Sequence, residues 1–166
     1  MTTPPASSNR PRVLFLCTGN SCRSQMAEGW AKALKSDVID AFSAGTNPHG
    51  LNPLAIRAMK EVGIDISAHS SKRPDQLPVP MDIVVTVCDS ANESCPVMPG
   101  ARVVHVGFDD PPRLAKGCAS DEEAMVHYRR VRDEIRAFVA GMPASLPGWS
   151  AMSFGQTAAP SAQISL

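Results

Sequence analysis

Two residues, Cys17 and Arg23, have the types and the spacing that most directly indicate chemistry. They belong to a loop of small polar residues, Cys17-Thr18-Gly19-Asn20-Ser21-Cys22-Arg23-Ser24. An apolar, strand-like run precedes this loop and a helical pattern follows it. Backbone N–H groups in such a loop, together with the N-terminus of the next helix, converge on one point that suits a tetrahedral oxyanion. The same positive field favours a thiolate at Cys17, and the planar guanidinium of Arg23 can bind two oxygens of the anion. The loop therefore predicts a nucleophile beneath an oxyanion site.

Ser24, Asp109 and Asp110 are polar residues that can assist the Cys17 thiol. The Ser24 hydroxyl can donate a hydrogen bond to the thiolate, and it can also cap the following helix; the two roles are compatible. Attack by Cys17 expels an oxygen from the central atom of the anion, and a positioned carboxylic acid protonates that oxygen. Asp109 and Asp110, which precede Pro111, both qualify. These residues alone leave the choice between the two aspartates open, and an Asp-Asp-Pro turn is also a common surface feature.

The overall composition is that of one domain without a strong net charge. The chain has 166 residues, of which 16 are basic and 16 acidic, so no long-range field attracts nucleic acid or an anionic membrane. The longest apolar runs are only as long as strands, and we expect no transmembrane helix. The first nine residues lack a basic-then-apolar signal pattern, so we expect a cytoplasmic protein.

Hydrophobic periodicity predicts a small α/β domain. The segment 82–87 is β-branched at its centre and apolar on both faces, which is typical of a central strand in a parallel sheet. Three more runs have the character of strands, and three segments have apolar residues at helical spacing. The predicted strands are residues 12–16, 38–42, 82–87 and 102–106, and the predicted helices are residues 25–34, 53–62 and 121–140.

This alternation of strands and helices predicts one domain, residues 12–142, built on a central four-stranded parallel sheet flanked by helices. Residues 1–11 are rich in Pro and Ser, and residues 143–166 are rich in Ala, Ser, Pro and Gly. We expect the first segment to be a flexible tail and the second to be disordered.

The five cysteines are an odd set for a disulfide framework. In a cytoplasmic protein we expect them to be catalytic, redox-active or metal-binding instead. Cys88 ends the central strand and Cys95 follows seven residues later, which is an arrangement that a hydrolase does not need and a reductase can use. Zinc binding by Cys17, Cys22, Cys88 and Cys95 fits poorly, because their spacings differ from those of zinc knuckles. We assign no metal to them, and we expect a structural role for Cys22 and no role for Cys118.

The loop and several separated segments resemble a known group of proteins. Residues 17–28 resemble the phosphate-binding loop of the low-molecular-weight protein tyrosine phosphatase fold and, more narrowly, that of the thioredoxin-coupled arsenate reductases. The resemblance extends over about residues 12–140 and includes the segments 42–45, 64–67, 87–96 and 107–111. It implies an oxyanion site formed by Thr18, Gly19, Asn20, Ser21, Cys22, Arg23 and Ser24. It also implies that Asp110 is the general acid.

The resemblance further implies a thiol relay that detoxifies arsenate. Cys17 attacks arsenate, Cys88 attacks the sulfur of the adduct so that arsenite leaves, and Cys95 resolves the Cys17–Cys88 disulfide. Thioredoxin would then reduce the Cys88–Cys95 disulfide. We expect a monomer without a bound cofactor, with phosphate and sulfate competing for the site and with some phosphatase side activity.

Three alternatives to this function stay open. A low-molecular-weight protein tyrosine phosphatase would usually have aromatic residues after Pro111 to stack on its substrate, and residues 112–115 have none. An oxyanion-binding or arsenite-binding regulatory domain would need neither Cys17 as nucleophile nor Asp110. A glutaredoxin or mycothiol system would supply its own resolving thiol, whereas the Cys88–Cys95 pair favours thioredoxin.

Some members of this family bind potassium beside the loop. The matching positions are Asn20, Glu28 and Ser43, but the fourth, usually an aspartate, is Lys72 here. The Lys72 ammonium can supply the positive charge beside Glu28, which predicts an activity that does not respond to potassium. The histidines His49, His69, His105 and His127 are scattered along the chain, and the sequence assigns no chemistry to them.

Overall fold

The computed structural model describes residues 10–149, except residues 79 and 97. Four parallel strands form one sheet in the order β2-β1-β3-β4. The bounds of the strands are β1 Arg12–Cys17, β2 Asp40–Gly45, β3 Ile83–Thr86 and β4 Arg102–His105. The predicted α/β domain with a four-stranded parallel sheet is therefore confirmed.

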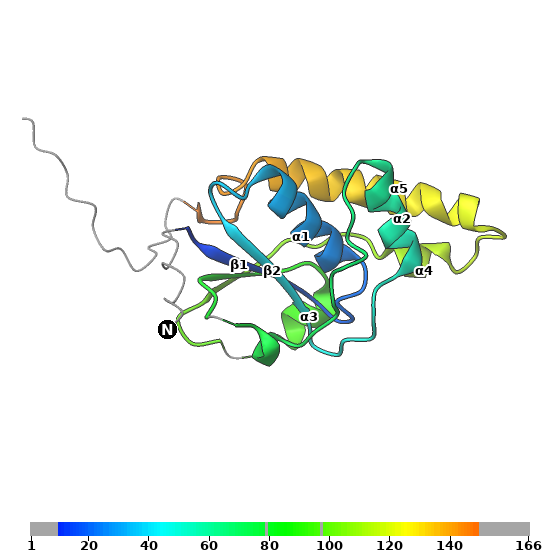
Figure 1. Cartoon of the computed structure of the whole chain (residues 1–166). Coiled ribbons are helices and arrows are strands. Elements are labelled where there is room, and N and C mark those ends of the chain that lie inside the picture. Colours follow the sequence, from blue (N-terminus) through cyan, green and yellow to red (C-terminus); the bar gives the residue numbers. More distant parts are fainter. Residues whose placement is uncertain (1–9, 79, 97, 150–166) are drawn as a thin grey trace, which may run out of the picture.

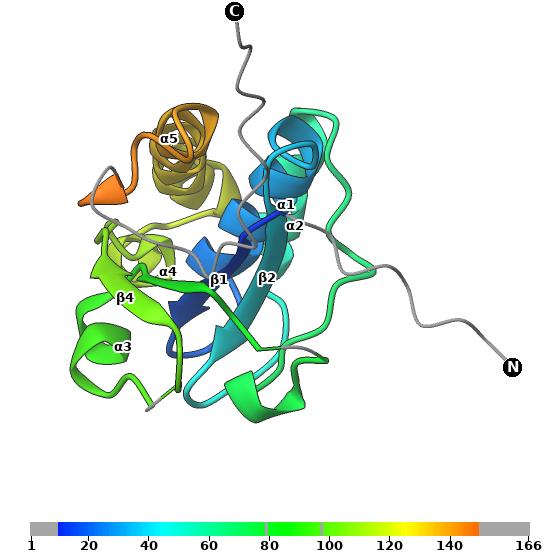
Figure 2. The same cartoon turned by 90° about the vertical axis from the view of Figure 1, so that its left-hand side faces the viewer.

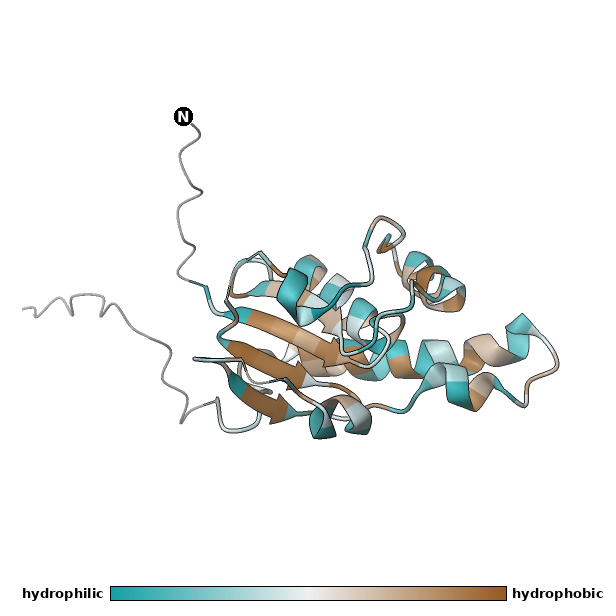
Figure 3. Ribbon diagram, turned by 90° about the horizontal axis from the view of Figure 1, so that it is seen from below, coloured by the Kyte–Doolittle hydropathy of each residue, from teal (hydrophilic) through white to brown (hydrophobic). Residues whose placement is uncertain are grey.

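The two central strands, β1 and β3, are the most apolar strands of the sheet. Residues 13–16 of β1 and 83–85 of β3 have no solvent exposure, as expected for strands that are covered on both faces. The edge strand β4 is largely exposed. Figure 3 shows the strands as the most hydrophobic part of the ribbon, while the helices carry hydrophilic residues on their outer surfaces.

Three long helices cover one side of the sheet, and a short helix lies on the other side (Figures 1 and 2). Helices α1, α2 and α5 pack together, and α1 also contacts β1 and β2. The short helix α3 follows β3 and contacts β1 and β3. The bounds of the helices are α1 Arg23–Leu34, α2 Pro53–Glu61, η1 Pro74–Gln76, α3 Asp89–Glu93, α4 Pro111–Ala115 and α5 Asp121–Ala140.

The second strand differs from its prediction. Residues 38–42 were expected to form it and Ser43-Ala44-Gly45 to end it, but β2 begins at Asp40 and continues to Gly45. The reason is its pairing with β1, in which Cys17 faces Gly45 in the parallel register. Pairing along a buried strand outweighs the turn-forming tendency of the Ser-Ala-Gly sequence.

The packed domain extends beyond the predicted boundaries at both ends. Arg10 forms an ion pair with Asp40 at 2.9 Å, although residues 10 and 11 were placed in the flexible tail. Leu146 is only 2% exposed and belongs to the core, although the C-terminal tail was expected to begin at residue 143. Their packing depends on contacts distant in sequence, which local composition does not reveal. The remainder of both predicted tails, residues 1–9 and 150–166, lies outside the described residues.

None of the helices in the described ranges is long and apolar enough to cross a membrane.

Candidate active site

The thiol of Cys17 lies at the carboxyl end of β1, where the loop of residues 17–22 leads into α1. This edge of a parallel sheet is where ligands usually bind in open α/β folds. The Cys17 side chain accepts a hydrogen bond from the backbone N–H of Asn20, with 3.1 Å between nitrogen and sulfur. Its sulfur also lies 2.8 Å from the hydroxyl oxygen of Ser24. The loop therefore curls around the sulfur atom.

Asn20 holds the loop in this shape. Its φ is 46°, in the left-handed region that asparagine tolerates better than most residues. The Asn20 side chain donates to the Ser24 hydroxyl at 2.9 Å and accepts from the backbone N–H of Lys72 at 3.0 Å. The Gln25 side-chain amide donates to the Asn20 carbonyl at 3.1 Å. Since Asn20, Ser24 and Gln25 have no solvent exposure, these bonds strongly constrain the loop.

A second segment, residues 46–52, supports the loop from outside. Its N–H groups donate to four of the loop carbonyls, which turns these oxygens away from the anion site. These bonds run from Thr46 to Cys17, Asn47 to Thr18, His49 to Gly19 and Asn52 to Ser21, at 2.8–3.2 Å.

Gly45, at the end of β2, allows this close approach. A Cβ atom there would lie 2.5 Å from the carbonyl oxygen of Thr18 and 2.7 Å from the nitrogen of Asn20. Both distances are much shorter than van der Waals contact, so any other residue at position 45 would displace the loop.

Cys17, Arg23, Cys88 and Asp110 line one cavity of about 240 Å³. The Arg23 guanidinium donates to the carbonyl oxygen of Phe108 at 2.9 Å, and its other terminal nitrogen lies 3.4 Å from Asp110. The Cys88 sulfur lies 3.6 Å from the Thr18 hydroxyl oxygen. The structure thus brings together four of the five predicted catalytic residues. It also places the predicted oxyanion-binding residues Thr18, Gly19, Ser21 and Cys22 in the lining of the same cavity.

The two candidate aspartates face different partners. Asp110 lines the cavity that contains Cys17, whereas the Asp109 carboxylate pairs with Arg130 of α5 at 2.9 Å. Geometry therefore favours Asp110 as the group that can reach an oxygen leaving from the site. Without the family resemblance, the sequence leaves this choice open, because the partner of Asp109 is an arginine of the last helix.

Cys95 lies apart from the other four residues. It follows the far end of α3, is partly exposed, and its thiol donates to the carbonyl oxygen of Pro96 at 3.6 Å. The five helical residues of α3 alone advance the chain by about 7.5 Å. The Cα atoms of bridged cysteines are about 4.4–6.8 Å apart, and α3 separates Cys88 from Cys95, so we expect α3 to rearrange when a Cys88–Cys95 bridge forms.

Burial governs the charge of the Cys17 thiol. The side chain is 4% exposed, and desolvation raises the pKa of Cys17 above its ordinary value, while hydrogen bonds from Ser24 and Asn20 oppose that shift. This direction differs from the thiolate expected from the loop pattern, because desolvation outweighs the local donors. Burial also raises the pKa of Cys22, in keeping with the structural role expected for it.

Residues 12–147 match the family of low molecular weight phosphotyrosine protein phosphatases. The chain belongs to this family. The arsenate reductase of Halalkalibacterium halodurans is 54% identical over 129 residues, which are 76% of this chain and 91% of that protein. The arsenate reductase of Bacillus subtilis is 53% identical over 125 residues, 74% of this chain and 88% of that protein.

A solved structure described as an arsenate reductase in the phosphate binding state is also similar to the chain. It has a TM-score of 0.64 and 30% sequence identity, and the match covers 82% of this chain and 99% of that chain. The resemblance inferred from the loop and the separated motifs is confirmed by these matches.

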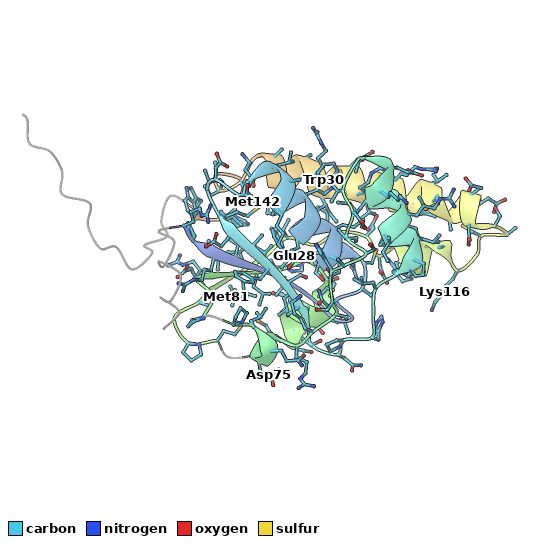
Figure 4. The ribbon with its side chains drawn as sticks, in the orientation of Figure 1. Glu28, Trp30, Asp75, Met81, Lys116 and Met142 are labelled. Carbon is cyan, nitrogen blue, oxygen red and sulfur yellow. The ribbon has the colours of Figure 1, made fainter. Side chains whose placement is uncertain are left out.

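Two lysines and a histidine surround Glu28, one of the positions that match the family's potassium site. Glu28 of α1, labelled in Figure 4, is buried, and its carboxylate is 2.9 Å from His69 and 3.7 Å from Lys32. Burial alone would raise the pKa of Glu28, but the His69 hydrogen bond and the charges of Lys32 and Lys72 lower it below its ordinary value. Burial is also the largest influence on Lys72, whose pKa is lowered although Glu28 opposes the shift.

This donor set does not fit a potassium ion. The Asn20 side-chain oxygen already accepts from the Lys72 backbone, and the Glu28 carboxylate already contacts His69 and interacts with the charges of Lys32 and Lys72. The buried Ser43 hydroxyl lacks a hydrogen-bond partner among the described residues, so its oxygen is the remaining atom that could coordinate the ion. An added monovalent cation here would be repelled by the Lys72 ammonium.

Sequence reasoning missed several residues that shape the site. Gln25 and His69 connect the loop to the segment after α2, with 3.0 Å between His69 Nδ1 and the Gln25 side-chain oxygen. Asn52 caps α2 and also donates to the Tyr128 hydroxyl at 2.9 Å. His49 lines the anion cavity. Of these residues only Asn52 is expected from the sequence, as the cap directly before Pro53, and the structure confirms it. The other contacts have no local sequence signal, because they join segments through the tertiary fold.

Proposed function

We propose that this protein reduces arsenate to arsenite by a thiol relay through Cys17, Cys88 and Cys95, with thioredoxin as the electron donor. The observation that supports it best is the placement of Cys88 in the cavity that holds Cys17, Arg23 and Asp110. A phosphatase that hydrolyses its cysteinyl intermediate with water has no need of that second thiol. The arsenate reductases that resemble this chain over most of their length support the same proposal.

The first step forms a bond between the Cys17 sulfur and arsenic. One oxygen of arsenate departs as water, and its two protons come from the thiol and from the hydrogenarsenate itself. Asp110 is placed to pass a proton to the departing oxygen, since its carboxylate lines the cavity and lies 3.4 Å from Arg23. Arg23 and the loop N–H groups hold the remaining oxygens and stabilise their negative charge.

The second step transfers the electrons. The Cys88 sulfur attacks the Cys17 sulfur, and the sulfur–arsenic bonding pair leaves with arsenic, which is reduced from arsenate to arsenite. Cys17 and Cys88 are thereby oxidised to a disulfide. The Cys95 sulfur then attacks Cys88, which releases Cys17 and leaves a Cys88–Cys95 disulfide. A dithiol of thioredoxin reduces that bridge and becomes oxidised itself.

A larger cavity adjoins the one that contains Cys17. It has a volume of about 560 Å³ and shares Arg23, Cys88, Ser90 and Asp110 with the smaller cavity. Its other walls come from α3 and the segment 107–113. Rearrangement of α3 into this space would bring Cys95 toward Cys88.

The decisive experiment couples the purified protein to thioredoxin, thioredoxin reductase and NADPH. We expect NADPH oxidation on addition of arsenate, and competitive inhibition by phosphate and sulfate. Hydrolysis of an aryl phosphate without any arsenate-dependent NADPH oxidation would instead identify a phosphatase. Reduction that requires glutathione with glutaredoxin, or mycothiol, would retain the relay but replace thioredoxin as the donor.

We also propose that Lys72 takes the place of a potassium ion beside Glu28. Its ammonium group is half-buried and is influenced by the Glu28 charge, while its backbone N–H binds Asn20 of the loop. Turnover of the wild-type protein should be equal in potassium and sodium chloride at constant ionic strength. The Lys72→Asp variant should gain a potassium stimulation of about threefold, whereas equal stimulation of wild type and Lys72→Ala would contradict the proposal.

A further inference from the structure

His49 has a side chain at the anion site that the relay does not use. It lines the 240 Å³ cavity together with Cys17, Arg23, Cys88 and Asp110. The residue itself is solvent-exposed, so its ring lies at the mouth of the cavity and not beneath the loop. A polar ring at that position can contact the outward side of a bound anion.

Backbone hydrogen bonds fix where the main chain of His49 lies. The His49 N–H donates to the Gly19 carbonyl at 3.2 Å, and the neighbouring bonds of Asn47 and Asn52 hold the segment on both sides of it. These three bonds hold the main chain of the segment, and with it the Cα atom of His49, against the loop. Its position follows from the tertiary pairing of residues 46–52 with the loop.

The glycine at position 19 supports this placement. Gly19 is not among the described glycines with positive φ, so its backbone does not require glycine. What requires it is space, because a Cβ atom at position 19 would lie 2.1 Å from His49 Nε2 and 2.5 Å from its Cε1. The imidazole therefore lies directly over the Gly19 peptide, which forms part of the anion loop.

We propose that the imidazole of His49 is a further anion-binding group, which donates a hydrogen bond to an oxygen of the bound tetrahedral oxyanion. This inference deepens the proposed function, since the anion is the arsenate of that reaction or a competing phosphate. The loop N–H groups and Arg23 contact the anion from one segment, and His49 adds a donor from a second. Arg23 shares its charge with Asp110 at 3.4 Å, which leaves part of the anion's charge for another donor to stabilise.

The test measures binding of inorganic phosphate to the full-length protein by titration calorimetry. His49→Leu keeps much of the side-chain volume but removes the donor, and should weaken phosphate binding about fivefold to tenfold. His49→Gln retains an N–H donor and should stay within about twofold of wild type. His127→Leu, on α5, is the matched control and should bind phosphate as wild type does.

Steady-state kinetics separate binding from a merely structural role. For His49→Leu we expect the KM for arsenate and for an aryl phosphate to rise by similar factors, with kcat within about twofold of wild type. Unchanged phosphate affinity in His49→Leu would overturn the proposal. Equal losses in His49→Leu and His49→Gln, accompanied by a fall in kcat, would also overturn it and assign His49 a packing role.

The Gly19→Ala variant provides an independent test of the same contact. The new methyl group must displace the ring, so Gly19→Ala should weaken phosphate binding, and adding His49→Leu should weaken it no further. Additive losses of phosphate affinity in the double variant would contradict the contact between His49 and Gly19. Phosphate binding does not require reduction of arsenate, so a failed reductase assay with the His49 effects intact would overturn the proposed function and leave this inference standing.

Discussion

The loop that begins at Cys17 and the segment that begins at Cys88 differ greatly in how firmly they are held. Each places a thiol at the carboxyl end of a buried strand, β1 or β3. In the loop, Asn20 and Ser24 are fully buried and hydrogen-bonded to each other. In the second segment, the side chain of Asp89 is 90% exposed and α3 has only five residues.

This difference matches the two tasks of the proposed relay. An anion site works best when its donors are already in place, because no energy is then spent on reorganising them. A segment that must bring Cys95 to Cys88 has to rearrange, and weak attachment lowers the free energy of that step. Two side-chain contacts attach α3 to the sheet: Thr86 donates to Asn92 at 3.2 Å, and His105 lies 3.1 Å from Asp89. The first contact is partly buried, and the second is exposed.

The largest predicted effect separates the two thiol regions by function. Cys88→Ser and Cys95→Ser should each lower thioredoxin-coupled arsenate reduction at least about 1,000-fold, because no disulfide can form without both sulfurs. Hydrolysis of an aryl phosphate, which needs only the loop, should stay within about threefold of wild type. Cys118→Ser serves as the control and should leave both activities unchanged. Full reductase activity in Cys95→Ser would show that Cys95 is not part of the relay.

A pH series tests whether burial raises the pKa of the Cys17 thiol. Burial raises the pKa of Cys17, so below that pKa the thiolate fraction grows about tenfold for each unit of pH. Alkylation of Cys17 by iodoacetamide should therefore increase about 100-fold between pH 6.5 and 8.5, measured by peptide mass spectrometry. The variant used should carry Ser at positions 88, 95 and 118. A rate that is already constant below pH 7 would indicate a lowered pKa instead.

Paired asparagine substitutions compare the rigidity of the two regions directly. Asn20→Ala should lower the free energy of unfolding by about 2–4 kcal/mol, because it leaves buried partners unpaired and places alanine at positive φ. Asn92→Ala, which removes one bond to Thr86 at an exposed position, should cost less than about 1 kcal/mol. Urea unfolding measures both values. Similar losses of unfolding free energy in the two variants would contradict the difference in rigidity between the two regions.

The smallest predicted effect concerns the contacts that hold α3. His105 lies 2.8 Å from the Thr86 hydroxyl and 3.1 Å from the Asp89 carboxylate, and His105→Ala removes both contacts. Amide hydrogen exchange in residues 89–94 should become about two- to fivefold faster, while exchange in residues 17–25 should not change. His127→Ala is the matched control. Unchanged exchange in residues 89–94 would show that other contacts stabilise the helix.

Local sequence patterns were sufficient for much of the fold. The apolar segment 82–87 predicted the central strand β3, and the loop between an apolar run and a helical pattern predicted the thiol at the end of β1. These inferences succeed because strand burial and loop chemistry depend on neighbouring residues. The end of β2 at Gly45 was predicted wrongly, since it depends on pairing with Cys17 across the sheet.

For this protein, the sequence by itself predicted which residues have chemistry: a nucleophilic thiol in an oxyanion loop, and two further thiols at redox spacing. Only the tertiary structure decided which of them meet. It placed Cys88 and Asp110 beside Cys17, turned Asp109 toward Arg130, and set His49 over Gly19. The physical reason is that spacing along the chain limits only local geometry, whereas these contacts join segments that come together when the parallel sheet forms and its helices pack.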